Sequence, residues 1–150
     1  MTVRRITVTD SLSAKHLAGA GQGIAVFSTP ELVRFVEICA LEGVRPFLAD
    51  GQETVGTRVD IRHLAATPVG MRVTAKCTLT EVDRRRLGFT FEVHDELDKI
   101  GEGTHERFII DREKQQQRLP TLRSRSLQSL APCLMHSSPS RRYRSLKMLR

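Results

Sequence analysis

The chain has 150 residues, of which 39% are hydrophobic, and a formal net charge of +7. That length suffices for about one domain with its own core, and no apolar run approaches the ~18 residues that a membrane span needs. Composition therefore argues against a membrane protein. The N-terminus lacks the continuous apolar stretch of a secretory signal, which predicts a cytoplasmic location. The three cysteines, Cys39, Cys77 and Cys133, show no metal-ligand spacing and are interpreted as reduced thiols outside any metal site.

A helix is predicted over the segment STPELVRFVEICALEGV. Ser28 or Thr29 is the expected cap, Pro30 the first helical residue, and Glu31 the partner of Ser28 in a capping box. Apolar residues recur at helical spacing and predict a broad buried stripe, made by Leu32, Val33, Phe35, Val36, Cys39 and Ala40. Glu37 lies on the margin of that stripe, where a carboxylate needs a partner.

Four segments after the helix alternate between apolar and polar residues with a period of two, which predicts strands. They are TVGTRVDIRH, MRVTAKCTL, LGFTFEV and GEGTHERFIID. The first is expected to place Val55, Thr57, Val59, Ile61 and His63 on one face. The short connections predict antiparallel neighbours, and one helix followed by such a meander is typical of an α+β layer arrangement.

The positive charge is concentrated at the C-terminal end. Residues 1–113 contain all 17 acidic residues and 15 basic ones, whereas the last 37 residues contain nine basic residues and no acidic one. We predict an ordered domain over 1–113 and a basic, mostly disordered extension over 114–150, with a weak helix around Ser126 to Met135. Such a tail can bind nucleic acid electrostatically; a solvated appendage is the preferred interpretation.

Three segments together suggest a family. The sequence STPELVRFVE, followed by TVGTRVDIRHLAATPVG and VHDELDKIGEGTHERFIID, resembles the hot-dog-fold thioesterases, most closely the fluoroacetyl-CoA thioesterase-like group. The resemblance implies a long helix wrapped by a curved antiparallel sheet, and a homodimer with active sites near the subunit interface. It also implies an acyl-CoA substrate, of which coenzyme A is a part, and no metal or redox cofactor.

The resemblance also assigns roles to individual residues. The catalytic Thr, Glu and His of that group fall on Thr29, Glu37 and His63. The glycine and the arginine associated with its substrate pocket correspond to Gly56 and Arg107.

The chemistry of these residue types agrees with the assignment. Thr29 lies at a helix N-terminus, which favours negative charge, and His63 can accept a proton at neutral pH. Glu37 would orient the imidazole and stabilise its charged form. However, Glu37 is about 12 Å along the helix from Thr29 at ~1.5 Å per residue. A contact between them therefore requires a water, a substrate atom, a non-helical Thr29 or the other subunit.

Each residue also has a purely structural interpretation. Thr29 could serve only as a helix cap, and Glu37 could pair with an arginine, Arg62 or Arg107. His63 could bond to the backbone at its strand end, and Arg107 could be an ordinary exposed strand residue. A glycine inside a strand, here at position 56, could mark a bulge or a close backbone approach. The joint pattern favours the catalytic interpretation.

The sequence thus predicts an acyl-CoA thioesterase that hydrolyses a small, fluoroacetyl-CoA-like thioester to the free acid and CoA. His63 would act as general base and Glu37 would position the nucleophile, while Thr29 would attack the thioester or align a water. The alternative is a non-catalytic hot-dog module that binds acyl-CoA or a protein partner and carries a basic tail.

Overall fold

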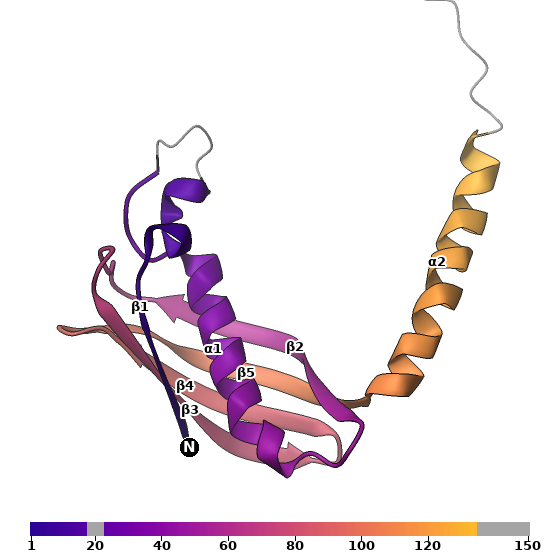
Figure 1. Ribbon diagram of the computed structural model, residues 1–150, viewed down its shortest axis with the longest axis horizontal. Helices are drawn as coiled ribbons and strands as arrows, with labels where there is room; N and C mark the ends of the chain where they lie inside the picture. Colours follow the sequence, from indigo (N-terminus) through magenta and orange to yellow (C-terminus); the bar gives the residue numbers. More distant parts are fainter. Residues whose placement is uncertain (18–22, 135–150) are drawn as a thin grey trace, which may run out of the picture. The chain divides into compact units, whose positions relative to one another are not determined.

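A curved antiparallel sheet wraps one long helix, α1 (Thr29–Val44), in the computed structural model (Figure 1). The structure describes residues 1–17 and 23–134, with side chains up to residue 124. Five strands form the sheet in the order β1-β3-β4-β5-β2. Their bounds are β1 (Thr2–Thr7), β2 (Gln52–His63), β3 (Arg72–Asp83), β4 (Arg86–His94) and β5 (Lys99–Asp111). This is the predicted α+β hot-dog arrangement.

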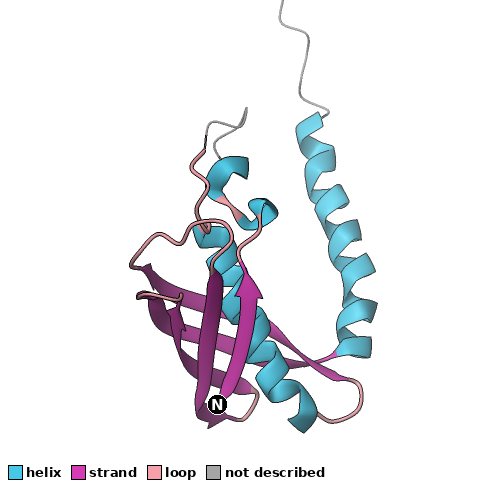
Figure 2. Ribbon diagram, turned by 60° about the vertical axis from the view of Figure 1, so that its left-hand side comes forward, coloured by secondary structure: helices cyan, strands magenta, loops and turns pink. Residues whose placement is uncertain are grey.

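Helix α1 lies along the concave side of the sheet (Figure 2). Its apolar stripe is buried as predicted, although Val33 is only half-buried and Val44 extends the stripe by a further turn. Three short 3₁₀ helices flank the long one: η1 (Asp10–Leu12), η2 (Ala14–His16) and η3 (Arg45–Phe47). The sheet's contribution to the core comes mainly from Val73, Ala75, Cys77, Leu87, Phe89, Phe91, Val93 and Ile100. Cys39 and Cys77 are buried free thiols in this core.

Strand β1 is an element that the alternation analysis did not predict. It offers only Val3 and Ile6 as large apolar residues, yet it pairs with β3 over its whole length. Its first residue also explains Gly43 of α1, because a Cβ at that position would collide with the Thr2 side chain. The glycine therefore allows the helix and the edge strand to approach closely, and α1 continues to Val44.

Strand β2 does not keep one face buried from end to end, contrary to the prediction. Its register against β5 shifts between Gly56 and Arg58, as expected for a β-bulge at a strand glycine. Because one extra residue reverses the side-chain alternation, Thr54 is 6% exposed before the bulge, whereas Val55 is 41% exposed. The half-buried Val59 and His63 follow the bulge, so the predicted common face holds only beyond it.

The C-terminal segment differs from the mostly disordered extension expected over 114–150. Residues Arg112–Leu134 form a helix, α2, which starts well before the weak helix predicted around Ser126. Good helix formers such as Glu, Lys, Gln and Arg fill its first turns, and these residues support a helix without a buried face. Its contacts separate it as a second unit beginning at Arg112. Residues 135–150 lie outside the described part of the chain. Within the described part, no helix is long and apolar enough to cross a membrane.

Candidate active site

The structure brings two of the three predicted catalytic residues into direct contact. The hydroxyl oxygen of Thr29 lies 2.9 Å from Nδ1 of His63, within hydrogen-bonding distance. Thr29 is the first residue of α1 and His63 the last residue of β2, so the contact joins two element ends that are 34 positions apart in sequence. We call Thr29 and His63 the dyad.

Of the two predicted cap residues, Ser28 is the one at the N-cap, so the alternative that Thr29 is the cap is wrong. Ser28 occupies the N-cap position, and its backbone N–H donates to the carbonyl of Leu12. The capping box does not form either, because Ser28 makes no side-chain cap hydrogen bond and the Glu31 carboxylate accepts from Arg34. The Thr29 hydroxyl is therefore available to His63.

The segment after His63 is held firmly beside the chain that leads into α1. The backbone N–H of Phe27 donates to the carbonyl of Thr67 at 2.8 Å. The buried Thr67 hydroxyl in turn donates to the Asp95 carboxylate, also at 2.8 Å. These bonds fix the chain on both sides of the dyad.

His63 retains one nitrogen for further chemistry. Burial lowers the pKa of its ring, an effect that a backbone hydrogen bond at Ala65 partly opposes. The neutral, proton-accepting form is therefore favoured at neutral pH. Its Nε2 atom is buried and has no hydrogen-bond partner among the residues that the structure describes. A buried ring nitrogen without a partner costs about 1–3 kcal/mol, so we expect a further group to bind it.

A pocket of about 400 Å³ opens at the dyad. Apart from Ser28 and the dyad itself, its lining is apolar: Ala14, Leu17, Val26, Phe27, Leu64, Ala65 and Ala66. The volume lies within the range of small-molecule sites. The N-terminus of α1 also points here, and its unpaired N–H groups favour a ligand that develops negative charge.

Glu37, the third predicted catalytic residue, does not reach His63 within one chain. Its carboxylate lies against the backbone of Gly56 at the β2 bulge, where an added Cβ would collide with it. The charge of Glu37 acts on His105 and Arg107, whereas the shift of the His63 pKa owes nothing to it. The carboxylate makes no hydrogen bond or ion pair to any residue in the described part of the chain.

Arg107 lies at the same place but is neither exposed nor paired with the Glu37 carboxylate. It is 5% exposed, and its guanidinium donates to the Thr54 hydroxyl and carbonyl, both at 2.9 Å. It also donates to the backbone carbonyl of Glu37 at 3.3 Å. The other suggested partner of Glu37, Arg62, instead bonds Glu102. The carboxylate therefore forms no ion pair with Arg62 or Arg107 in the described part of the chain, although its charge raises the pKa of Arg107 against the effect of burial.

Sequence reasoning missed a further residue of this group. His105, to which the sequence assigned no role, is 1% exposed and lies 3.2 Å from Arg107. The alternation of β5 could have found it, because His105 shares a strand face with Arg107 and lies opposite Val59 in the sheet. We call Glu37, Thr54, Gly56, His105 and Arg107 the buried cluster.

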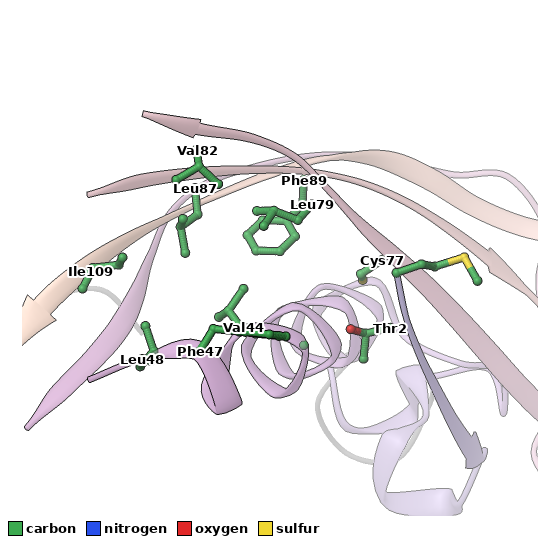
Figure 3. A pocket seen from close by; sticks show the side chains of 12 residues that line it. Thr2, Val44, Phe47, Leu48, Cys77, Leu79, Val82, Leu87, Phe89 and Ile109 are labelled. Carbon is green, nitrogen blue, oxygen red and sulfur yellow. The ribbon is translucent and has the colours of Figure 1, made fainter. Parts of the chain in front are cut away.

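A second pocket, of about 490 Å³, lies at the opposite end of α1 from the dyad. Figure 3 shows Val44, Phe47 and Leu48 facing side chains of β3, β4 and β5 across this space. Its lining is almost entirely apolar and contributes none of the five predicted site residues. None of the predicted site residues therefore lies at this end of the helix.

Comparison with known proteins gives a consistent result. A family described as fluoroacetyl-CoA-specific thioesterase matches residues 7–113. The fluoroacetyl-CoA thioesterase of Streptantibioticus cattleyicolor is 40% identical over 89 residues, which cover 59% of this chain and 64% of that protein. The match thus spans less than two thirds of the length of this relative.

Solved structures share the architecture. A variant of the fluoroacetyl-CoA-specific thioesterase FlK, in complex with fluoroacetate and CoA, is 31% identical with a TM-score of 0.76. The alignment covers 81% of this chain and 98% of that one. A thioesterase superfamily member from Thermus thermophilus is 29% identical with a TM-score of 0.77, over 83% of this chain and 90% of that one.

Proposed function

The chain belongs to the fluoroacetyl-CoA-specific thioesterase family, and from this premise we propose that it hydrolyses a small acyl-CoA to the free acid and coenzyme A. The observation that carries the proposal is the 2.9 Å contact between the Thr29 hydroxyl and His63 at the mouth of a pocket. The small, apolar pocket suits a short acyl group such as fluoroacetyl. In this proposal coenzyme A is part of the substrate and not a cofactor. We also propose that the protein is cytoplasmic.

In the proposed reaction, His63 is the general base. Its Nδ1 takes the proton of the Thr29 hydroxyl as the threonine oxygen attacks the thioester carbonyl, or the proton of a water that this hydroxyl aligns. The oxyanion forms near the N-terminus of α1, where helix N–H groups stabilise it. The protonated His63 then returns the proton to the departing thiolate. On the first route, a water that gives its proton to His63 next attacks the acyl–Thr29 ester, and the proton returns to the Thr29 oxygen as the free acid leaves. Detection of an acyl group on Thr29 by mass spectrometry distinguishes the first route from the second.

We further propose that the site is completed in a homodimer. In the described part of one chain, His63 Nε2 has no hydrogen-bond partner. No hydrogen bond or ion pair there involves the Glu37 carboxylate, which acts on His105 and Arg107 only through its charge. A two-fold interface makes contacts reciprocal, so His63 can meet Glu37 of the partner subunit in two equivalent sites. The outer edge of β2, the last strand of the sheet, provides a surface on which a second copy can pair.

Thiol release from a panel of acyl-CoA substrates tests the catalytic function. The panel comprises acetyl, fluoroacetyl, longer aliphatic and aromatic acyl groups, and we expect release from short ones with activity unchanged by a metal chelator. The rival function, a non-catalytic module, predicts binding of acyl-CoA without thiol release. Retention of intact acyl-CoA throughout the panel would therefore overturn the proposal.

Mixing two inactive variants tests the shared site. In a heterodimer of His63→Ala and Glu37→Gln subunits, one of the two sites receives both intact residues if Glu37 comes from the partner. Random exchange should then restore about a quarter of wild-type activity, since about half of the dimers are mixed and each has one complete site. If both residues act within one subunit, the mixture stays inactive, and the proposed exchange is wrong.

A further inference from the structure

His105 of the buried cluster has a protonation state that its neighbours determine. Its Nδ1 lies 2.8 Å from the backbone carbonyl of Arg58, which can only accept, so Nδ1 carries the hydrogen. Its Nε2 lies 3.2 Å from Nη1 of Arg107, which can only donate. Nε2 must therefore be the unprotonated nitrogen. The ring is neutral in one tautomer.

The ring is also fixed in place by packing. Phe89 stacks on it, with ring centroids 6.1 Å apart and an angle of 29° between the planes. On another side, its Cε1 lies 3.2 Å from the point that a Cβ on Gly56 would occupy. Burial lowers the pKa of His105, and the charge of Arg107 lowers it further, against opposing effects of the Arg58 carbonyl, Glu37 and Glu106.

Arg107 depends on such neutral acceptors. Its guanidinium makes four hydrogen bonds, two to Thr54, one to the Glu37 carbonyl and one to His105. No carboxylate forms an ion pair with it among the described residues, and burial lowers its pKa. Because Nη1 binds both the Glu37 carbonyl and His105, the imidazole determines where this end of the guanidinium lies. Loss of the His105 acceptor would leave a buried charged donor unpaired, which is strongly unfavourable.

We propose that His105 is a positioning residue, whose unprotonated Nε2 holds Arg107 against the Glu37 turn of α1 and the Gly56 bulge. His105 itself does not touch the substrate. It acts through Arg107, which connects β5 to the first half of β2 and to the middle of α1. The inference rests on the proposed function, because it concerns the same site.

Two substitutions separate the two nitrogens of His105. His105→Gln places an amide oxygen near the Nε2 position and can still accept from Arg107. In His105→Asn the shorter amide reaches only the position of Nδ1. It can still donate to the Arg58 carbonyl, but the hydrogen bond to Arg107 is lost. We expect His105→Asn to lower kcat/KM by about tenfold or more, the usual effect of losing a hydrogen bond to a charged group, and His105→Gln to retain most activity.

A second comparison shows whether the effect passes through Arg107. His105→Asn should change the same parameter, KM or kcat, as Arg107→Gln, and adding it to Arg107→Gln should cause little further loss. Equal losses in the Gln and Asn variants, or fully additive losses with Arg107→Gln, would show that His105 only fills space and would overturn the proposal.

A measurement that needs no turnover keeps this result distinct from failure of the proposed function. Imidazole nitrogen NMR of the wild-type protein at neutral pH should show His105 neutral, with its hydrogen on Nδ1. A charged ring, or hydrogen on Nε2, would overturn the positioning role even in an active enzyme. If the wild type releases no thiol but this tautomer is present, the catalytic proposal fails, and binding of acyl-CoA replaces turnover as the measurement for the variants.

Discussion

The dyad and the buried cluster differ in how exposed their side chains are and in how many of their hydrogen-bonding groups have a partner. In the dyad, Thr29 is exposed and His63 keeps a nitrogen without a partner. In the buried cluster, His105 and Arg107 are almost completely inaccessible, both ring nitrogens of His105 have a hydrogen-bond partner, and Arg107 makes four hydrogen bonds. The dyad, whose residues we propose to react, thus keeps unused hydrogen-bonding capacity, whereas His105 and Arg107, which we propose to support it, bond within the chain.

This difference shows how the chain combines reactivity with precision. A general base must be able to exchange a proton with a substrate, and His63, the proposed base, lies at an element end beside an open pocket. The residues that fix geometry lie on the interior of β2 and β5, where packing and several hydrogen bonds restrict them. Glu37 is the exception within the buried cluster, because its backbone carbonyl accepts from Arg107 whereas its carboxylate makes no hydrogen bond or ion pair in the described part of the chain.

Removal of the base should have the largest effect. His63→Ala deletes the only partner of the Thr29 hydroxyl seen in the structure, and we expect kcat/KM to fall by about a hundredfold or more, the range for general-base catalysis. Because His63 is only half-buried, the melting temperature should change little. Thiol release from acyl-CoA and thermal unfolding measure the two effects. His94→Ala, outside both groups, is the matched control, and wild-type-like turnover of the His63 variant would refute the role of the dyad.

A methyl group at the bulge should have an intermediate effect. In Gly56→Ala the new Cβ displaces the Glu37 carboxylate, which can swing away at little cost, and crowds the buried His105 ring, which has little room to move. We expect a loss of about 1–3 kcal/mol in the free energy of unfolding, as for other overpacked sites, together with a clear fall in kcat/KM. Val55→Ala, at the neighbouring exposed position, should change neither by much. Equal behaviour of the two variants in denaturant titrations would contradict a tightly packed cluster.

Much of the fold could be predicted from the sequence because its signals are local. The buried stripe of α1 and the alternation of four strands follow directly from residue spacing. The exceptions have physical causes. The bulge at Gly56 reverses the faces of β2, and β1 is held by pairing with β3 rather than by its own apolar residues.

The candidate site was predictable in its residue types but not in its geometry. Sequence identified Thr29 and His63, and their contact needs only that two element ends meet. It could not show that Glu37 lies against Gly56, because this depends on how α1 packs over the sheet. It also overlooked His105, although the alternation of β5 places this histidine on the same strand face as Arg107. The alternation does not show which groups bond the two side chains, because this depends on how β5 pairs with β2.

The smallest expected effect is a shift in the pH dependence of activity. Burial lowers the pKa of His63 from its usual 6.5, and a general base works only when deprotonated. The rate kcat/KM should therefore rise with pH through a value below 6.5. A base with the usual pKa would be half active at pH 6.5, so the lowered value raises the rate there by less than about twofold. A profile of kcat/KM between pH 5 and 8 measures this shift.

His105→Gln is the control for this profile. The fall in kcat/KM at low pH, the acid limb, should remain in this variant, because the substitution removes the second histidine while keeping the acceptor for Arg107. If the limb disappears in that variant, the titrating group belongs to the buried cluster, and the division between reacting dyad and supporting cluster is wrong.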